Sequence, residues 1–309
     1  MHSALVAGML GLACLSACSK SGNSSRPAPS ASVNANGNAN TSGNANTSAS
    51  ARATVPHLVQ VKPECRALAV AGKASIDGVP IRVGDLLDGE HWVVLEAGSS
   101  VALRDTLTSR ELKLIGPGLE LPCRHGAEQV LIAQGRLSTS TTLGVRPGAE
   151  VLIATPAGTV RYGDAAIELE FGPKGLHLRV KEGDAWLEPE NLGQPPFKNP
   201  LHNPSQASLP PSKATAAELV ETCKAAADTA AESARRVLAA GTPQAPASLG
   251  ARAAAHVRNR SAARAACSIA AAAAGSVTDP AARQSLWDSI THADELWQSV
   301  PRGVSAQKN

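Results

Sequence analysis

Aromatic residues are scarce in this chain of 309 residues: four Trp, two Phe and one Tyr together make up 2% of it. Proteins that bind single-stranded nucleic acids stack the bases on aromatic side chains, and aromatic clamps for sugars need similar rings. The formal net charge of +3 is also too small to indicate a nucleic-acid partner. We therefore expect no nucleic acid among the partners of this protein.

Sequence patterns of catalysis are also missing. There is no phosphate-binding loop, no metalloprotease histidine pair and no serine in a nucleophile elbow. Glu168 and Glu170 fall on one face of a predicted strand, which favours a solvated strand face over an acid/base pair. Cys123 and His125 lack the second close pair that a metal site needs. We expect no enzymatic activity, no metal and no cofactor, and a cryptic hydrolase stays an alternative.

No segment has the roughly 20 consecutive apolar residues that a membrane-spanning helix needs. A shorter apolar run precedes Leu15-Ser16-Ala17-Cys18, which matches a lipobox, the sequence at which signal peptidase cuts bacterial lipoproteins. The pattern predicts a signal peptide over residues 1–17 and a lipidated Cys18 at the new N-terminus. An ordinary signal peptide with an incidental cysteine is the alternative.

Ser19 follows the predicted lipidation site, and serine at this position favours the outer membrane over the inner membrane. We expect a lipoprotein of the bacterial cell envelope, anchored to the outer membrane by lipid. The periplasmic side is favoured over the cell surface, and the sequence leaves the side open.

The composition divides the rest of the chain into segments. Residues 18–55 hold the lipidated cysteine and an Asn, Ser, Gly and Ala tether with no core-forming residues, whose span is about 30–35 Å. Residues 191–212 are rich in proline and predict a stiff linker, and residues 301–309 form a tail. Two folded domains are expected between these segments, at 56–190 and 213–300.

The first of these domains, residues 56–190, has short apolar runs separated by Gly, Asp and Pro, which predicts an all-β sandwich or short solenoid. The expected strands centre on residues 81–83, 92–95, 101–103, 112–115, 129–132, 151–153, 167–171 and 176–180. Trp92 and Trp186 lie beside such strands, so a core position is favoured for both over an exposed ligand site.

The second domain, residues 213–300, is predicted to be helical. A stripe from Val220 to Val237 recurs at intervals of three and four, and Gly241 and the prolines after it end that helix. A second helix is expected over residues 249–274, and Asp279-Pro280 begins a third. The predicted fold class is therefore α+β, with two domains: an all-β domain followed by an antiparallel three-helix bundle.

Four cysteines remain after Cys14 leaves with the signal peptide and Cys18 takes the lipid. They fall two to a domain, as Cys65 with Cys123 and Cys223 with Cys267, and outside the cytoplasm such pairs predict disulfides. Cys223 and Cys267 are equally distant from the turn near Ala245, so an antiparallel hairpin places them opposite each other. Buried free thiols are the alternative.

One stripe of the helical domain is basic. His256, Arg260 and Arg264 recur every four residues and suit phosphate or peptidoglycan carboxylates. Asp228 and Glu232 are expected on the neighbouring helix, and this favours a neutralised, solvated face.

Several short motifs follow one another through the β domain in a fixed order. They are Gly84-Asp85, Leu95–Leu103, Ile115-Gly116-Pro117-Gly118, Gln134–Leu137, Ile153–Ala157 and Val180–Leu187. In this order the segment from Val79 to Leu187, about a third of the chain, resembles the FecR-type domain of Gram-negative bacteria, named for the iron-dicitrate uptake regulator. Gly163-Asp164-Ala165-Ala166 departs from the Gly-Thr-x-Phe segment that is usual in the family.

The FecR-type regulators also have a cytoplasmic anti-sigma part and a transmembrane helix, which differ from the lipobox, tether and helices found here. The resemblance therefore implies a periplasmic β module for protein contact or scaffolding, with an envelope protein as partner. An accessory to sensory signalling by TonB-linked receptors is one alternative, and binding of carbohydrate or cell wall is another. The oligomeric state is left open.

Overall fold

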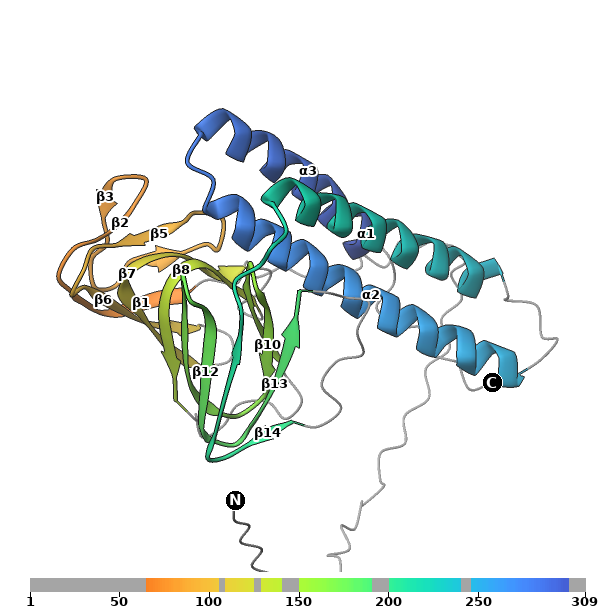
Figure 1. Ribbon diagram of the computed structural model, residues 1–309, viewed down its shortest axis with the longest axis horizontal. Helices are drawn as coiled ribbons and strands as arrows, with labels where there is room; N and C mark the ends of the chain where they lie inside the picture. The colour runs from red at the N-terminus through yellow and green to blue at the C-terminus, as the bar shows by residue number, and fades with distance from the viewer. Residues whose placement is uncertain are drawn as a thin grey trace, which may run out of the picture. The chain divides into compact units, whose positions relative to one another are not determined.

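Figure 1 shows a computed structural model of the chain, which describes residues 65–105, 109–124, 129–140, 150–190, 200–239 and 246–299. Cys18, the predicted signal peptide and the predicted tether lie outside the described residues, as do the tail at 301–309 and His125. The described residues form fifteen strands and three helices, which confirms the α+β class. None of the described helices has the length and apolar character needed to cross a membrane.

All fifteen strands belong to one hydrogen-bonded sheet, which divides into two branches that share the long strands β7 (Glu111–Arg124) and β8 (Gln129–Thr139). The first branch continues from these two through β6 (Ser100–Asp105), β1 (Cys65–Ala71) and β4 (Leu86–Leu87) on one side and through β11 (Ala166–Gly172), β12 (Gly175–Glu182) and β15 (Ser205–Leu209) on the other.

The second branch continues through β5 (Val93–Leu95), β2 (Ala74–Ile76) and β3 (Val79–Pro80) on one side and through β9 (Val151–Thr155), β10 (Gly158–Tyr162), β13 (Asp184–Pro189) and β14 (Leu201–His202) on the other. The β8–β9 pair is parallel and the other pairs are antiparallel.

The two branches enclose one hydrophobic core. Residues of a strand alternate between its two faces, and the inward set of the first branch includes Leu114 and Leu169, whereas Ile153 and Val160 come from the second. Pairing on β7 is irregular between Ile115 and Leu119, the point at which this strand passes from one branch to the other. The disulfide between Cys65 and Cys123 ties β1 to β7 with a Cα separation of 6.0 Å.

Three helices follow the sheet: α1 (Ala216–Ala239), α2 (Pro246–Gly275) and α3 (Pro280–Gln298). Thr215 and Glu218 form a capping box at the start of α1, in which the Glu218 carboxylate accepts the Thr215 N–H at 2.7 Å. This hydrogen bond lowers the pKa of Glu218. Asp279 caps α3 as predicted, whereas α2 begins at Pro246, three residues before its predicted start, because proline suits the first turn of a helix.

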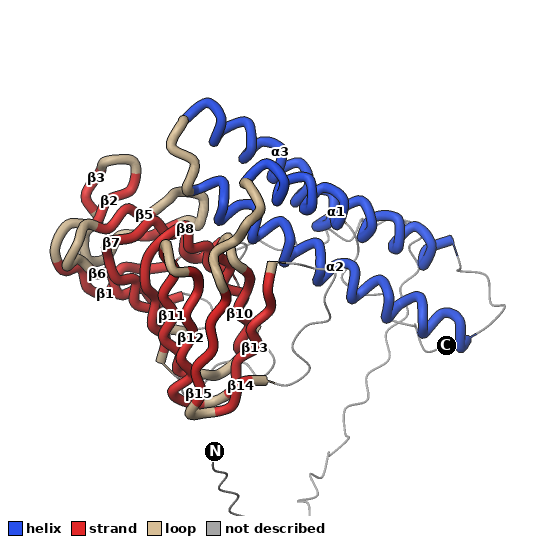
Figure 2. The backbone as a smooth tube through the Cα atoms, in the orientation of Figure 1, coloured by secondary structure: helices blue, strands red, loops and turns tan. Residues whose placement is uncertain are grey.

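The helices lie along one side of the sheet (Figure 2). The middle helix, α2, contacts β8, β9 and β10 of the second branch. Leu121 of β7, Leu131 of β8 and Ala154 of β9 point outward from the sheet and share one buried cluster with Ile269 and its neighbours on α2. The outer face of the second branch is therefore covered by helix, and the predicted β and helical regions pack against each other.

The structure differs from the expected linker at 191–212. Its first nine residues lie outside the described part, but Leu201–His202 and Ser205–Leu209 are strands β14 and β15. Each of them pairs with one strand of the sheet, and proline is tolerated beside such edge strands because one side needs no ladder hydrogen bonds. The expected strand at 81–83 also differs, because β3 and β4 flank these residues.

Candidate functional site

The outer face of the first branch is the candidate site. Helices cover the other branch, whereas this face carries a hollow of about 450 Å³ over β8, β11, β12 and β15. We call this outer face of the first branch the open face. The residues that line it are Ile115, Arg136, Leu137, Ser138, Glu168, Leu169, Glu170, His177, Leu178, Arg179, Gln206, Ala207 and Ser208.

Strand register aligns the polar side chains of the open face in two rows that cross the strands. One row consists of Ser138, Glu168, Arg179 and Gln206, which are direct cross-strand partners. The other row consists of Arg136, Glu170, His177 and Ser208. Positions two residues apart point to the same face of a strand, so the two rows lie side by side, about 7 Å apart.

Charges of both signs alternate within these rows. Glu168 forms ion pairs with Lys181 and, at 3.9 Å, with Arg179. Glu170 lies between Arg136 and His177, and within the described residues no ion pair engages any of these three exposed side chains. Opposite charges on neighbouring strands stabilise a sheet by less than about 1 kcal/mol per pair. The second row therefore keeps charged groups that can bind a partner of mixed charge.

Glu120 is a second unusual group, and no sequence pattern points to it beyond its place as a charged residue among leucines. It lies opposite Val93 and Ile132 of the core, it is fully buried, and its carboxylate oxygens have no hydrogen-bond partner among the described residues. Burial raises its pKa well above the usual range, because the charged form loses its hydration. A Cβ at Gly135 would approach its Oε1 to 2.3 Å, so glycine makes room for this side chain.

We expect the stability of the protein to fall as pH rises because of Glu120. The unfolded carboxyl titrates near pH 4.3, whereas the folded one keeps its proton to higher pH. The stability that the protonated Glu120 carboxyl contributes is fully present below the unfolded pKa. It is lost as pH rises toward and through the folded pKa. Urea unfolding at a series of pH values should show that Glu120→Gln loses less stability than the parent as pH rises. Glu96→Gln, at an exposed side chain, is the control, and equal pH slopes in all three proteins would contradict the assignment.

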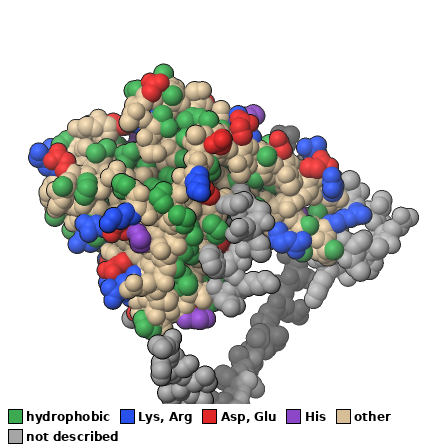
Figure 3. All heavy atoms as spheres, in the orientation of Figure 1, with side chains coloured by type: hydrophobic (Ala, Val, Ile, Leu, Met, Phe, Trp, Pro, Cys, Tyr) green, Lys and Arg blue, Asp and Glu red, His purple; other side chains and the backbone are tan. Residues whose placement is uncertain are grey.

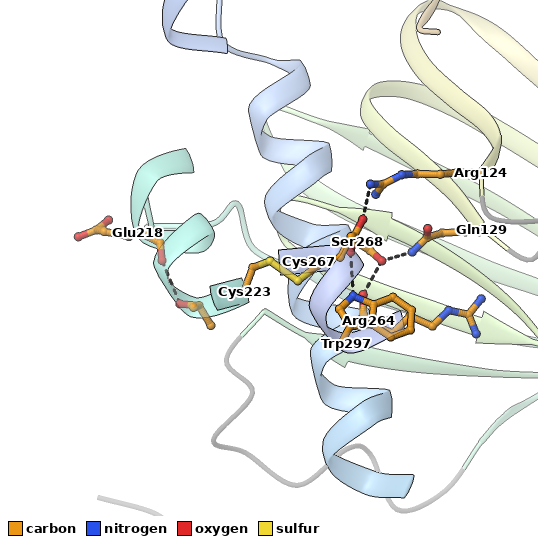
Figure 4. The surroundings of a disulfide bond; sticks show 10 residues. Arg124, Gln129, Glu218, Cys223, Arg264, Cys267, Ser268 and Trp297 are labelled. Atoms are coloured by element: carbon orange, nitrogen blue, oxygen red, sulfur yellow. Dashed lines mark hydrogen bonds and ion pairs between the residues drawn. A yellow bond between two sulfur atoms is a disulfide. The ribbon is translucent and has the colours of Figure 1, made fainter. Parts of the chain in front are cut away.

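The junction between sheet and helices is polar at its centre (Figure 4). Arg124 of β7 forms a buried ion pair with Asp294 of α3, whose carboxylate also accepts the indole N–H of Trp297 at 2.8 Å. The Arg124 guanidinium lies 5.2 Å from the ring centre of Trp287. Burial lowers the pKa of Arg124, and the Asp294 carboxylate opposes that shift.

A second polar contact and an aromatic pair complete the junction. Gln129 of β8 donates to Ser268 of α2. Trp92 and Trp287 meet edge to face with their ring centres 6.2 Å apart. Gly275, at the end of α2, leaves the room that the Trp92 ring needs, since a Cβ there would approach the ring to 2.5 Å.

The structure brings together some of the residues singled out from sequence. Cys65 is joined to Cys123 and Cys223 to Cys267, as predicted. Trp92 is half-buried at the helix junction, away from the core between the branches, and Trp186 is also half-buried.

The basic stripe of α2 is neither the anion-binding stripe nor the neutralised, solvated face considered from sequence. His256 is buried, with Nδ1 3.0 Å from the Ser233 hydroxyl, and the Arg260 guanidinium stacks over Trp297 at 5.2 Å from the ring centre. These two side chains therefore hold the helices together. Among the described residues, no group of three or more His, Cys, Asp or Glu is placed to hold a metal ion.

A scan against models of protein families finds no match to this chain, and a search of curated proteins also finds none.

Proposed function

We propose that this protein is a non-enzymatic lipoprotein of the bacterial cell envelope whose FecR-like β domain binds another envelope protein. Its lipid anchor is Cys18, and the outer membrane, on the periplasmic side, is its proposed location. The observation that carries the proposal is the open face: one side of the sheet is covered by the protein's own helices, while the other presents a hollow with mixed charges.

The chemistry of the open face favours a polypeptide partner. Arg136 and Glu170 offer one cation and one anion side by side, and complementary charges of both signs steer and orient protein partners. Among the described residues, no Trp, Tyr or Phe lines the hollow, and this weighs against sugar binding. The edge strand β15 borders the same hollow and pairs only with β12 among the described strands, so an extended segment of the partner can add to this edge.

The proposal predicts a site-specific crosslink in living cells. A photo-crosslinking residue at His177 should capture one envelope protein, identified by mass spectrometry, whereas the same residue at Thr222 of α1 should not. Charge reversal in Arg136→Glu or Glu170→Arg should reduce the captured amount at least about tenfold, because like charges meet in the complex. Lys73→Glu reverses an exposed charge outside the open face and should leave capture unchanged.

Two outcomes would contradict this assignment. Capture that is equal at His177 and Thr222 would place the contact elsewhere. If both charge reversals left capture unchanged, the open face would not take part in binding the partner. A Cys18→Ser variant tests the anchor separately, since it should lose membrane attachment and capture while keeping its fold.

A further inference from the structure

The distribution of charge along the helical region is strongly uneven. Between Glu232 and Asp279 there is no acidic residue, whereas this stretch holds six arginines and one histidine. The whole chain has a net charge of only +3, so the positive charge of this segment is balanced elsewhere in the molecule. The stretch covers the end of α1 and all of α2.

The fold places much of this charge at the end of a helical hairpin. In Figure 1, α1 and α2 continue past the end of α3. The last turns of α3 reach Ala231 and Ala234 of α1 through Leu296, and Arg260 of α2 through Trp297. Residues 235–239 of α1 and 246–258 of α2 lie beyond these contacts, and we call them the hairpin end. Figure 3 shows Lys and Arg side chains gathered there, at the right of the view.

The charged side chains of the hairpin end are exposed and only partly neutralised. Arg235 and Arg236 are 72% and 73% exposed, and they share one carboxylate, that of Glu232. Arg252 and Arg258 on α2 are exposed, and within the described residues no ion pair engages them. Since a structural ion-pair network would supply an acid for each arginine, this excess of positive charge is available to an external anion.

Two large aliphatic side chains accompany the arginines. Leu238 is 61% exposed and Val257 is 53% exposed, and among the described residues few large apolar side chains are exposed to this extent. Burying them against another apolar phase is favourable by about 25 cal/mol per Å². A surface that combines exposed arginines with exposed aliphatic side chains is typical of contact with an anionic membrane surface.

We propose that the hairpin end binds the anionic headgroups of the membrane to which the protein is anchored. The choice of lipid rests on the proposed anchor at Cys18, which keeps the hairpin end close to a bilayer. Guanidinium groups pair with phosphate oxygens through two parallel hydrogen bonds, while Leu238 and Val257 enter the region between headgroups and acyl chains. The contact fixes how the domain lies on the membrane and therefore where the open face points.

The test uses the full chain with Cys18→Ser, which removes the lipidated thiol and leaves the hairpin end intact. Its partition onto vesicles of phosphatidylglycerol and phosphatidylcholine is compared with partition onto phosphatidylcholine alone. Binding should require the anionic lipid and should fall between about 0.1 M and about 1 M salt, since the screening length drops from about 10 Å to about 3 Å. Each arginine near an anionic surface contributes about fivefold in affinity.

The double variant Arg235→Gln/Arg236→Gln should therefore bind about 25-fold more weakly. The matched control, Arg66→Gln/Lys113→Gln, removes two exposed charges from the sheet and should bind like the parent. The side chains of both pairs are exposed, so circular dichroism should show unchanged folding.

Three results would overturn the proposal. Equal partition onto neutral and anionic vesicles would remove the role of headgroup charge. Equal losses of vesicle affinity in the double variant and its control would mean that binding depends only on the net charge of the protein. Binding to polyglutamate but not to vesicles, dependent on Arg235 and Arg236, would assign the hairpin end to an acidic protein. These results leave the open face untouched, because that site is tested by crosslinking from His177.

Discussion

Replacing Asp294 by alanine is expected to cost about 3–5 kcal/mol of the free energy of unfolding. The variant leaves the buried guanidinium of Arg124 without an acidic partner among the described residues, and a buried unpaired charge is among the most costly defects in a folded protein. It also removes the acceptor of the Trp297 indole N–H. Because Arg124 belongs to the sheet and Asp294 to α3, the loss should fall on the junction between them.

A double-mutant cycle separates the charge from the packing. Arg124→Met combined with Asp294→Leu replaces the ion pair by apolar side chains, and this exchange is often neutral or stabilising in protein interiors. We expect the double variant to recover most of the stability that Asp294→Ala loses. Urea unfolding, monitored by circular dichroism, gives the free energies of unfolding of the parent, Arg124→Met, Asp294→Leu and the double variant.

The exposed pair between Arg104 and Glu111 is the matched control. Both side chains are about half exposed, so Glu111→Ala should cost less than about 1 kcal/mol. If Asp294→Ala cost no more than Glu111→Ala, the junction would not depend on the buried ion pair. If the apolar double variant were as unstable as Asp294→Ala, lost packing and not an unpaired charge would be the cause.

The helices could be predicted from sequence because their signals are local. Asp279-Pro280 begins α3 because aspartate accepts the first free N–H groups and proline tolerates the first turn. The pairing of Cys223 with Cys267 also followed from local reasoning, since two helices joined by a short connection fix which residues face each other. These features require no knowledge of how distant segments pack.

The sheet was less predictable because its contacts are made across long stretches of chain. Strand β15 pairs with β12 although prolines surround it, and no local pattern indicates that pairing. The contact of Trp92 with Trp287 joins residues far apart in the chain, so the sequence only suggested that Trp92 is buried. Glu120 has no local signal beyond being a charged residue among leucines, since its burial depends on the strands β5 and β8 that pair on either side of it.

Only part of the candidate site could be predicted from sequence. Alternation alone places Glu168 and Glu170 on one face of a strand, and the structure agrees. The register that puts Arg136 and His177 on either side of Glu170 depends on β8, β11 and β12 meeting in one order, which the sequence does not show. The face of a strand is a local property, whereas the neighbours on that face are a property of the fold.

Removing the bridge between Cys223 and Cys267 is expected to destabilise the helical hairpin by about 4 kcal/mol on the chain-entropy model. The bridge closes a loop with a sequence separation of 44 and joins α1 to α2 at a Cα separation of 4.5 Å. Small alanine side chains, such as Ala227 and Ala270, allow this approach and bury little apolar area in return. The hairpin therefore depends on the bridge more than a leucine-rich pair of helices would.

The double variant Cys223→Ala/Cys267→Ala tests this, with Cys65→Ala/Cys123→Ala as its matched control. The control bridge lies in the core of leucine, isoleucine and valine between the two branches, where packing holds the strands without it. In the first variant, hydrogen exchange should show α1 amides losing protection well below the urea concentration that unfolds the sheet. In the control, α1 should keep its protection up to global unfolding. A hairpin that stays protected in both variants would mean that alanine packing alone is sufficient to hold α1 against α2.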